Sequence, residues 1–138
     1  MTMNFAGQIL PEANFRGEIL MDADFTDAVL VQANMLACDL SGAKMNNANL
    51  NGADLTDADL SGASLVGVDF TRARLRGANF SGADLTGAKL ASTDLQEADF
   101  RGAKIDVENL DISGARAWQQ AKWDEPVLEA LKAKFGSK

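Results

Sequence analysis

The 138-residue chain contains no histidine, no tyrosine and a single cysteine, Cys38. Without histidine it lacks the commonest general base of enzymes and the commonest metal ligand of proteins. One cysteine allows no internal disulfide. The sequence also lacks a phosphate-binding loop and a dinucleotide-binding fingerprint. These absences favour a protein that is not an enzyme and that holds no cofactor and no metal ion.

Long apolar segments are missing as well. No apolar run approaches the length that crosses a membrane, and the N-terminus does not read as a signal peptide. We therefore expect no membrane contact and a cytoplasmic location. The alternative is the periplasm or a thylakoid lumen, if a signal segment has been removed.

Positive charge is scarce relative to negative charge. The chain has 20 Asp and Glu against 13 Lys and Arg, a net charge of −7. Residues 1–112 hold 17 of the acidic and 8 of the basic residues. Because nucleic acids and anionic membranes attract cations, this balance predicts no direct nucleic-acid binding. We expect one or more protein partners of unknown identity instead.

The most regular feature present is a strict period of five. A large apolar residue stands at every fifth position from Phe5 to Leu110. Five fits neither the 3.6-residue turn of a helix nor the two-residue alternation of a flat strand. The chain must therefore turn a corner once per repeat, with the large apolar side chain pointing inward.

The other positions of the repeat indicate which side chains face in and which face out. Alanine usually stands two residues before the large apolar residue, on the same side of an extended segment. Asp or Asn usually precedes it directly and faces outward. Most glycines stand two residues after it, where Gly, Asp and Asn tolerate the backbone angles of a tight corner. Cys38 falls at an alanine position and is interpreted as a small buried side chain rather than a nucleophile.

The repeat Ala-(Asp/Asn)-Leu-(Ser/Thr)-Gly is cleanest at residues 53–62 and 78–87. It resembles the repeat of the pentapeptide repeat family over roughly residues 3–112. The resemblance implies an all-β solenoid, a right-handed quadrilateral β-helix with four repeats per coil and about five and a half coils. At a coil spacing of ~4.8 Å the solenoid would be ~26 Å long. We expect residues 1–112 to form the β-helix and residues 113–138 to form a short C-terminal α-helical cap.

The composition becomes helical after Leu110. Ala115–Trp123 predicts a short helix, and Val127–Phe135 predicts a second one, with Asp124 as its N-cap and Pro126 in its first turn. We expect the apolar side chains of this tail to cover the last coil: Trp118, Trp123, Val127, Leu128, Leu131 and Phe135. The alternative is a dimer surface, because members of the family often dimerise end to end through their C-terminal segment. The chain would then be a monomer or an end-to-end homodimer.

The first repeats depart from the pattern. Gln8 and Glu18 occupy inward positions where alanine is the rule, so we expect Glu18 at the open mouth of the first coil, where it reaches solvent. Several outward positions near this end are apolar: Ile9, Ile19, Met21, Val29, Val31 and Leu36. A contiguous apolar patch suggests a partner or dimer surface. Tolerance of β-branched residues on a sheet face is the alternative reading.

With four repeats per coil, residues twenty apart stack in outward columns. One column consists of Asp39, Asp59, Asn79 and Asp99. We favour solvated, turn-bonding side chains here over a Ca²⁺ site, because Asp and Asn at this position are general to the repeat.

Four cations form a basic corner that interrupts the acidic surface: Arg72, Arg74, Arg76 and Lys89. One interpretation is a site for an anion or a partner. The other is a set of salt bridges along the columns, with Asp54, Asp94 and Glu97.

Two functions compete on this sequence. The first is a non-enzymatic structural or protein-interaction module that presents a rigid acidic β-helical surface. The alternative is a DNA mimic that binds DNA gyrase and protects it from quinolones, as the resemblance implies for some members of the family. The short solenoid, the absence of a loop insertion and the basic corner weigh against the mimic.

Overall fold

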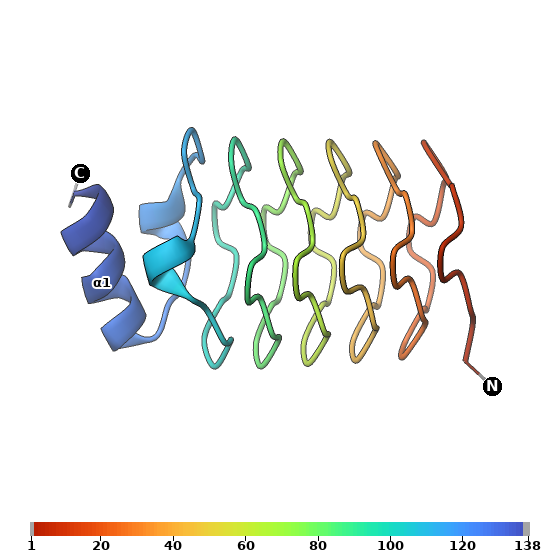
Figure 1. Cartoon of the computed structure of the whole chain (residues 1–138), viewed down its shortest axis with the longest axis horizontal. Helices are drawn as coiled ribbons and strands as arrows, with labels where there is room; N and C mark the ends of the chain where they lie inside the picture. Colours follow the sequence, from red (N-terminus) through yellow and green to blue (C-terminus); the bar gives the residue numbers. More distant parts are fainter. Residues whose placement is uncertain (1, 137–138) are drawn as a thin grey trace.

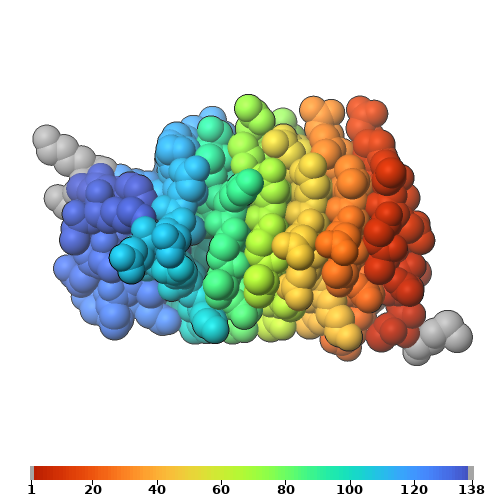
Figure 2. Space-filling model, viewed as in Figure 1, coloured from red at the N-terminus to blue at the C-terminus, as the bar shows by residue number. Residues whose placement is uncertain are grey.

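The computed structural model describes residues 2–136, which wind into a β-helix. Figure 1 shows the coils stacked along the long axis, with the N-terminal coil at one end and the helix α1 at the other. The space-filling view shows the same order, with α1 packed directly against the last coils (Figure 2). The expected β solenoid is therefore the architecture of the chain.

Parallel bridges join each coil to the next. Asn4 pairs with Asp24, and the same twenty-residue step recurs along the chain as far as Asp84 with Lys104. Each bridge is formed by backbone hydrogen bonds; for example, the amide of Arg74 donates to the carbonyl of Ala53 at 2.9 Å. Within residues 2–136 the bridges are isolated, because each side of a coil turns its corner before a longer strand can form.

Four corners per coil follow from the backbone angles. Positive φ values recur at every fifth residue, as at Gly7, Glu12, Gly17 and Asp22. Glycine is needed at Gly77 for a second reason, since a Cβ there would overlap Oδ1 of Asp57 on the preceding coil. The five-residue period thus sets both the sides and the corners of the coil.

The core is a column of stacked side chains. The apolar centres from Phe15 to Phe100 are buried, together with the small residues beside them, which include Cys38. Aromatic rings stack from coil to coil: the rings of Phe80 and Phe100 are parallel with centroids 4.7 Å apart. Phe5 and Leu10 in the first coil are only partly buried.

The last coil differs from the expectation. Lys89 pairs with Asp111, 22 residues further along the chain, and Asp99 pairs with Lys122, 23 residues further. Two short 3-10 helices take up the extra residues: η1, Val107–Asn109, and η2, Trp118–Gln120. The β-helical ladder therefore continues to Lys122, so the boundary expected at residue 112 falls inside the last coil.

The expected helix over Ala115–Trp123 is wrong, because only Trp118–Gln120 is helical in this stretch. The amide of Leu90 donates to the carbonyl of Asp111, which places Ile112 rather than Leu110 in the position of a core centre. Leu110 takes the small-residue position instead and is still buried. A stretch rich in Ala, Gln and Lys is compatible with a coil when its backbone pairs with the coil before it.

The helix α1, Glu125–Phe135, begins two residues earlier than expected. Pro126 lies in its first turn, and Gly136 ends it with a φ of 89° and a backbone amide that donates a hydrogen bond to the carbonyl of Lys132. Asp124 precedes the helix, but its side chain does not cap it. The carboxylate instead accepts a hydrogen bond from the amide of Gly102 at 2.9 Å and so ties the helix to the β-helix. No helix within residues 2–136 is long and apolar enough to cross a membrane.

Candidate interaction surfaces

One side of the β-helix, here called the acidic face, consists of residues 18–22, 38–42, 58–62, 78–82 and 98–102. It carries five acidic residues and one basic residue, Arg101. Its bridge column runs through Asp39, Asp59, Asn79 and Asp99, as the sequence predicted. Asp39 and Asp59 are thus neighbours on successive coils with no cation between them in their column.

Hydrogen bonds hold these carboxylates in fixed positions. The Ser41 hydroxyl donates to Asp39 Oδ1 at 2.7 Å, and the Ser41 amide donates to the same oxygen at 3.0 Å. Ser61 makes the same two bonds to Asp59, at 2.6 and 2.9 Å. The side chains bond within their own turn, as expected. In the described part of the chain, no group of three or more Cys, Asp or Glu side chains is arranged to hold a metal ion.

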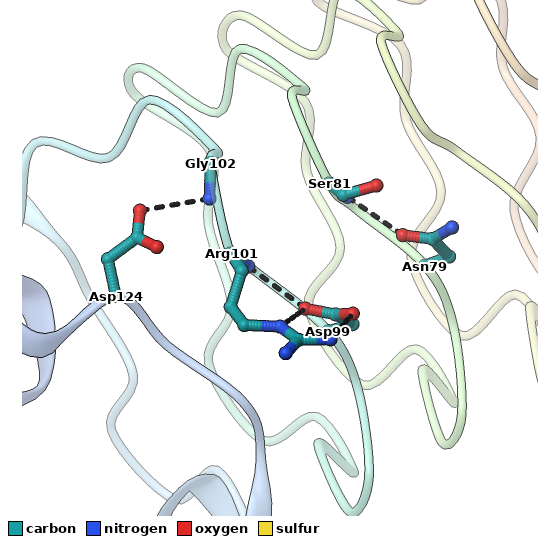
Figure 3. Close-up of polar contacts among 6 residues, drawn as sticks. All are labelled: Asn79, Ser81, Asp99, Arg101, Gly102 and Asp124. Carbon is teal, nitrogen blue, oxygen red and sulfur yellow. Dashed lines mark hydrogen bonds and ion pairs between the residues drawn. The ribbon is translucent and has the colours of Figure 1, made fainter.

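The C-terminal end of the acidic face is neutralised. Arg101 stands where serine stands in the three preceding coils, and its guanidinium forms a two-point contact with Asp99, at 3.0 and 2.8 Å (Figure 3). Arg101 holds the pKa of the Asp99 carboxyl below its usual range. Lys122 follows Asp99 in the bridge column. The uncompensated part of the face therefore lies over the first three coils.

The other three sides alternate in charge. Asp54 is followed in its column by Arg74, Asp94 and Arg116. A second column runs through Asp24, Lys44, Ser64, Asp84 and Lys104, and a third through Asp69, Lys89 and Asp111. In these columns each carboxylate has a cation on an adjacent coil, so neighbouring charges offset one another.

Turn hydrogen bonds also shift carboxylate acidity on these sides. The Thr86 hydroxyl donates to Asp84 Oδ1 at 2.6 Å and lowers the pKa of that carboxyl from its ordinary value. The Ser113 hydroxyl has the same effect on the pKa of Asp111. In both cases the charged carboxylate accepts a hydrogen bond that the protonated form would lose.

The basic corner is exposed at all four of its residues: Arg72, Arg74, Arg76 and Lys89. Arg74 forms an ion pair with Asp54 at 3.6 Å. It also lines an open groove with Gln32, Asn34 and Asp54. Within residues 2–136 the ion pairs expected with Asp94 and Glu97 are not formed. Long cationic side chains on a surface lose little by staying solvated, so Arg72 and Arg76 present positive charge at this corner without an ion pair to a described residue.

The apolar residues singled out near the N-terminus fall into two groups. Ile9, Ile19 and Met21 in the first coil are exposed, with 74%, 75% and 52% of their surface accessible. Val29, Val31 and Leu36 in the second coil are half-buried. Ile9 and Val29 pair across the two coils, as expected. Glu18 is exposed at the mouth of the first coil, which agrees with the prediction.

The apolar residues of the tail cover the end of the core. The Trp123 ring stacks on Phe100 at a centroid distance of 4.3 Å, and its Nε1 donates to the carbonyl of Trp118 at 2.8 Å. Leu131 is fully buried, and Val127 and Leu128 are partly buried against the core. Phe135 differs from the expectation, because its side chain is 37% exposed.

Two contacts were not foreseen from the sequence. Lys134 on α1 donates to the carbonyls of Val107 and Glu108, at 2.9 and 2.6 Å, and so binds the helix to η1. The Cys38 thiol donates to the carbonyl of Phe15 at 2.7 Å, and burial raises its pKa. No sequence signal marks Lys134, whereas Arg101 could have been noticed as a cation in a serine column.

Comparisons with known proteins agree with the repeat. The family model described as Pentapeptide repeats matches in eight copies, within residues 4–35, 19–57, 33–72, 53–91 and 69–106. Comparison with curated protein sequences gave no match.

Among solved structures, the chain is similar to the pentapeptide repeat protein Rfr23 of the cyanobacterium Cyanothece 51142. The identity is 25%, the TM-score is 0.49, and 88% of this chain and 91% of that chain are covered. A pentapeptide repeat protein of the Arabidopsis thaliana thylakoid lumen is 32% identical, with a TM-score of 0.38 and coverages of 81% and 83%. QnrB1, a plasmid-mediated fluoroquinolone resistance protein, is 24% identical, with a TM-score of 0.39 and coverages of 97% and 70%.

Proposed function

The chain belongs to the pentapeptide repeat family, whose members fold as right-handed β-helices, and on that premise we propose that it is a non-enzymatic protein-interaction module. Its acidic face docks a cationic segment of a partner protein. The proposal fits a chain without histidine, in which the buried thiol of Cys38 bonds to a backbone carbonyl.

The observation that carries this proposal is the uneven distribution of charge among the four sides. Three sides alternate acidic and basic residues, whereas Asp39 and Asp59 on the acidic face stack without a cation. Like charges on neighbouring coils cost stability, so a fold that only needed solubility would gain by alternating here as well. A cationic partner would relieve the repulsion.

The rigidity of the face supports recognition of a partner. Each carboxylate is fixed by the amide and hydroxyl of the serine two residues on. A partner therefore meets charges that are already positioned and loses little side-chain entropy on binding. Such a surface would steer association through its field and bind more weakly at high salt.

The test is capture of partners from a lysate with two variants that differ only in which side loses its charge. Asp39→Asn with Asp59→Asn removes the charge of the acidic face. Asp54→Asn with Asp94→Asn removes as much charge from an alternating side. We expect both pairs to keep the fold, because Asn79 and Asn34 already occupy these columns and accept the same hydrogen bond from the amide two residues on.

We expect that the wild type captures a partner protein at low salt and releases it at high salt. The first variant, Asp39→Asn with Asp59→Asn, should fail to capture that protein. The second variant should retain it. The captured protein, once purified, should bind the wild type at least about tenfold more tightly than the first variant, a difference of ~1.4 kcal/mol. Equal binding by both variants would contradict docking at the acidic face.

The second candidate is the DNA mimic that acts on gyrase, and the acidic excess of residues 1–112 favours it. The exposed Arg72, Arg74 and Arg76 weaken it, since they place positive charge along two sides of the β-helix. A gyrase supercoiling assay separates the two candidates. Protection of gyrase at micromolar protein would support the mimic, and the absence of any effect would rule it out.

A further inference from the structure

The two ends of the β-helix differ in how their core is covered. At the C-terminal end, Trp123 stacks on Phe100 and Leu131 of α1 is fully buried. At the N-terminal end, Phe5 stacks on Phe25 with centroids 4.7 Å apart, and within residues 2–136 no further ring follows it. Phe5 and Leu10 are only partly buried, so one end of the core column is open.

Apolar surface gathers at the same end. The described residues include five large apolar side chains that are exposed, and four of them lie in the first coil: Met3, Ile9, Ile19 and Met21. We call these four the N-terminal rim. In Figure 1 the first coil lies at the end of the molecule opposite α1, away from the tail that covers the other end.

The backbone of the first coil is also unpaired on its outer side. In the second coil, the amides of Val29, Asn34 and Asp39 donate to carbonyls of the first coil at 2.8 to 3.0 Å. The equivalent amides of Ile9, Asn14 and Ile19 make no hydrogen bond to any described residue. An open edge of this kind is where another chain adds.

We propose that the N-terminal rim binds the N-terminal rim of a second copy of this chain, so that two β-helices join head to head. A head-to-tail stack is disfavoured, because Trp123 and α1 occupy the end that would have to receive the rim. The head-to-head pair is isologous and closed, which gives a dimer and not a filament. Its facing coils run antiparallel, and antiparallel edges pair by exchanging N–H and C=O groups.

The charged residues of the first coil can pair with the same residues of a second copy. Glu12, Arg16 and Glu18 are exposed on the first coil and carry both signs. Within residues 2–136 none of the three is in an ion pair. A two-fold axis through their side of the coil brings Arg16 of each copy near Glu12 of the other. The two copies thus match in apolar surface, backbone edge and charge.

The size of the end sets the strength of the dimer. With four sides of five residues at about 3.3 Å each, the end measures about 16.5 Å on each side, so a pair buries on the order of 550 Å² in total. Stable complexes bury about 1,200–2,000 Å², so the dimer is weak, with a Kd on the order of micromolar. It therefore forms and dissociates with protein concentration.

The test is sedimentation velocity of the full chain over a concentration series from about 0.5 to about 200 μM, a span that brackets the expected Kd. The wild type should shift from its monomer mass of 14.7 kDa to twice that mass. Ile19→Asp places a charge on the rim and should weaken the dimer at least about tenfold. Phe135→Ser removes an exposed apolar side chain at the other end and should leave the dimer unchanged.

A charge reversal tests the orientation. Arg16→Glu should weaken the dimer, and adding Glu12→Arg should restore it, because the two charges exchange places. The melting temperature of each variant checks that its fold is intact. A wild type that stays monomeric throughout would overturn the proposal, and so would a dimer lost in Phe135→Ser but kept in Ile19→Asp.

Discussion

An Asp or Asn that directly precedes a core position controls the backbone of its own repeat. Its side-chain oxygen accepts the amide two residues on, as Asp54 does from Thr56 at 3.0 Å and Asn79 from Ser81 at 2.9 Å. In several repeats the hydroxyl of that second residue donates a second bond to the same oxygen, as Thr86 does to Asp84. The outward Asp column is thus part of the turn as well as of the surface charge.

This role predicts a pH dependence of stability. The pKa of Asp84 is lower in the folded chain than its ordinary value of 3.8, with the Thr86 hydroxyl as the largest cause. The stabilisation from this carboxylate is therefore present above about pH 4 and is lost as the pH falls through the lowered pKa. Thr86→Val should raise the pKa of Asp84 and reduce the loss of stability between about pH 4 and about pH 2.

Carboxyl NMR titration and urea unfolding at several pH values measure the two effects. Thr71→Val is the matched control, because only the Thr71 amide is bonded to Asp69. An unchanged pKa of Asp84 in Thr86→Val would show that the hydroxyl does not hold the carboxylate.

Among the elements, the last coil and α1 form the C-terminal cap. The core ends in a stack of rings from Phe80 through Phe100 to Trp123. Asp124 and Lys134 then bond α1 to the backbone of Gly102 and of η1. The cap is thus an extension of the β-helix, in which an aromatic residue continues the core and a helix covers it.

Removing the last ring should expose the end of the core. Trp123→Ala leaves a cavity over Phe100 and should lower the free energy of unfolding by about 3–5 kcal/mol. Phe135→Ala, at a residue that is already 37% exposed, should lower it by less than about 1 kcal/mol. Urea denaturation of both variants measures the difference. Similar losses of unfolding free energy in the two variants would mean that the stacked Trp123 ring does not hold the cap in place.

The elements also show what the sequence could and could not predict. The period from Phe5 to Ile105 fixes the columns, because one residue of slip would turn every core side chain outward. The register after Ile105 could not be predicted, since the two residues added near η1 move Ile112 into the core position that Leu110 was expected to fill. The salt bridges expected of Arg74 depend on rotamers, and only the one with Asp54 forms.

At the scale of the whole molecule, each coil contacts only its neighbours, so a defect in one coil weakens the stack on both sides. Leu60 lies in the middle of the column and is fully buried. Leu60→Asp would place a charge without a partner in the core and should cost at least about 3–5 kcal/mol, enough to unfold several coils. Arg76→Asp changes an exposed residue and should change stability by less than about 1 kcal/mol.

Circular dichroism and urea denaturation compare the two variants. A Leu60→Asp chain as stable as Arg76→Asp would mean that the side chains assigned to the interior are not inside.

The proposals on the acidic face and the N-terminal rim both depend on the twenty-residue coil, and a cysteine cross-link measures it most directly. In a Cys38→Ala background, Asn49→Cys with Asp69→Cys places thiols on a bridge pair of adjacent coils, within the separation that a disulfide spans. Asn49→Cys with Ser64→Cys places them on different sides of the β-helix. Oxidation at low protein concentration should link the first pair within one chain and leave the second pair unlinked. Linkage of the second pair in preference to the first would contradict the twenty-residue coil, and with it the acidic face and the N-terminal rim.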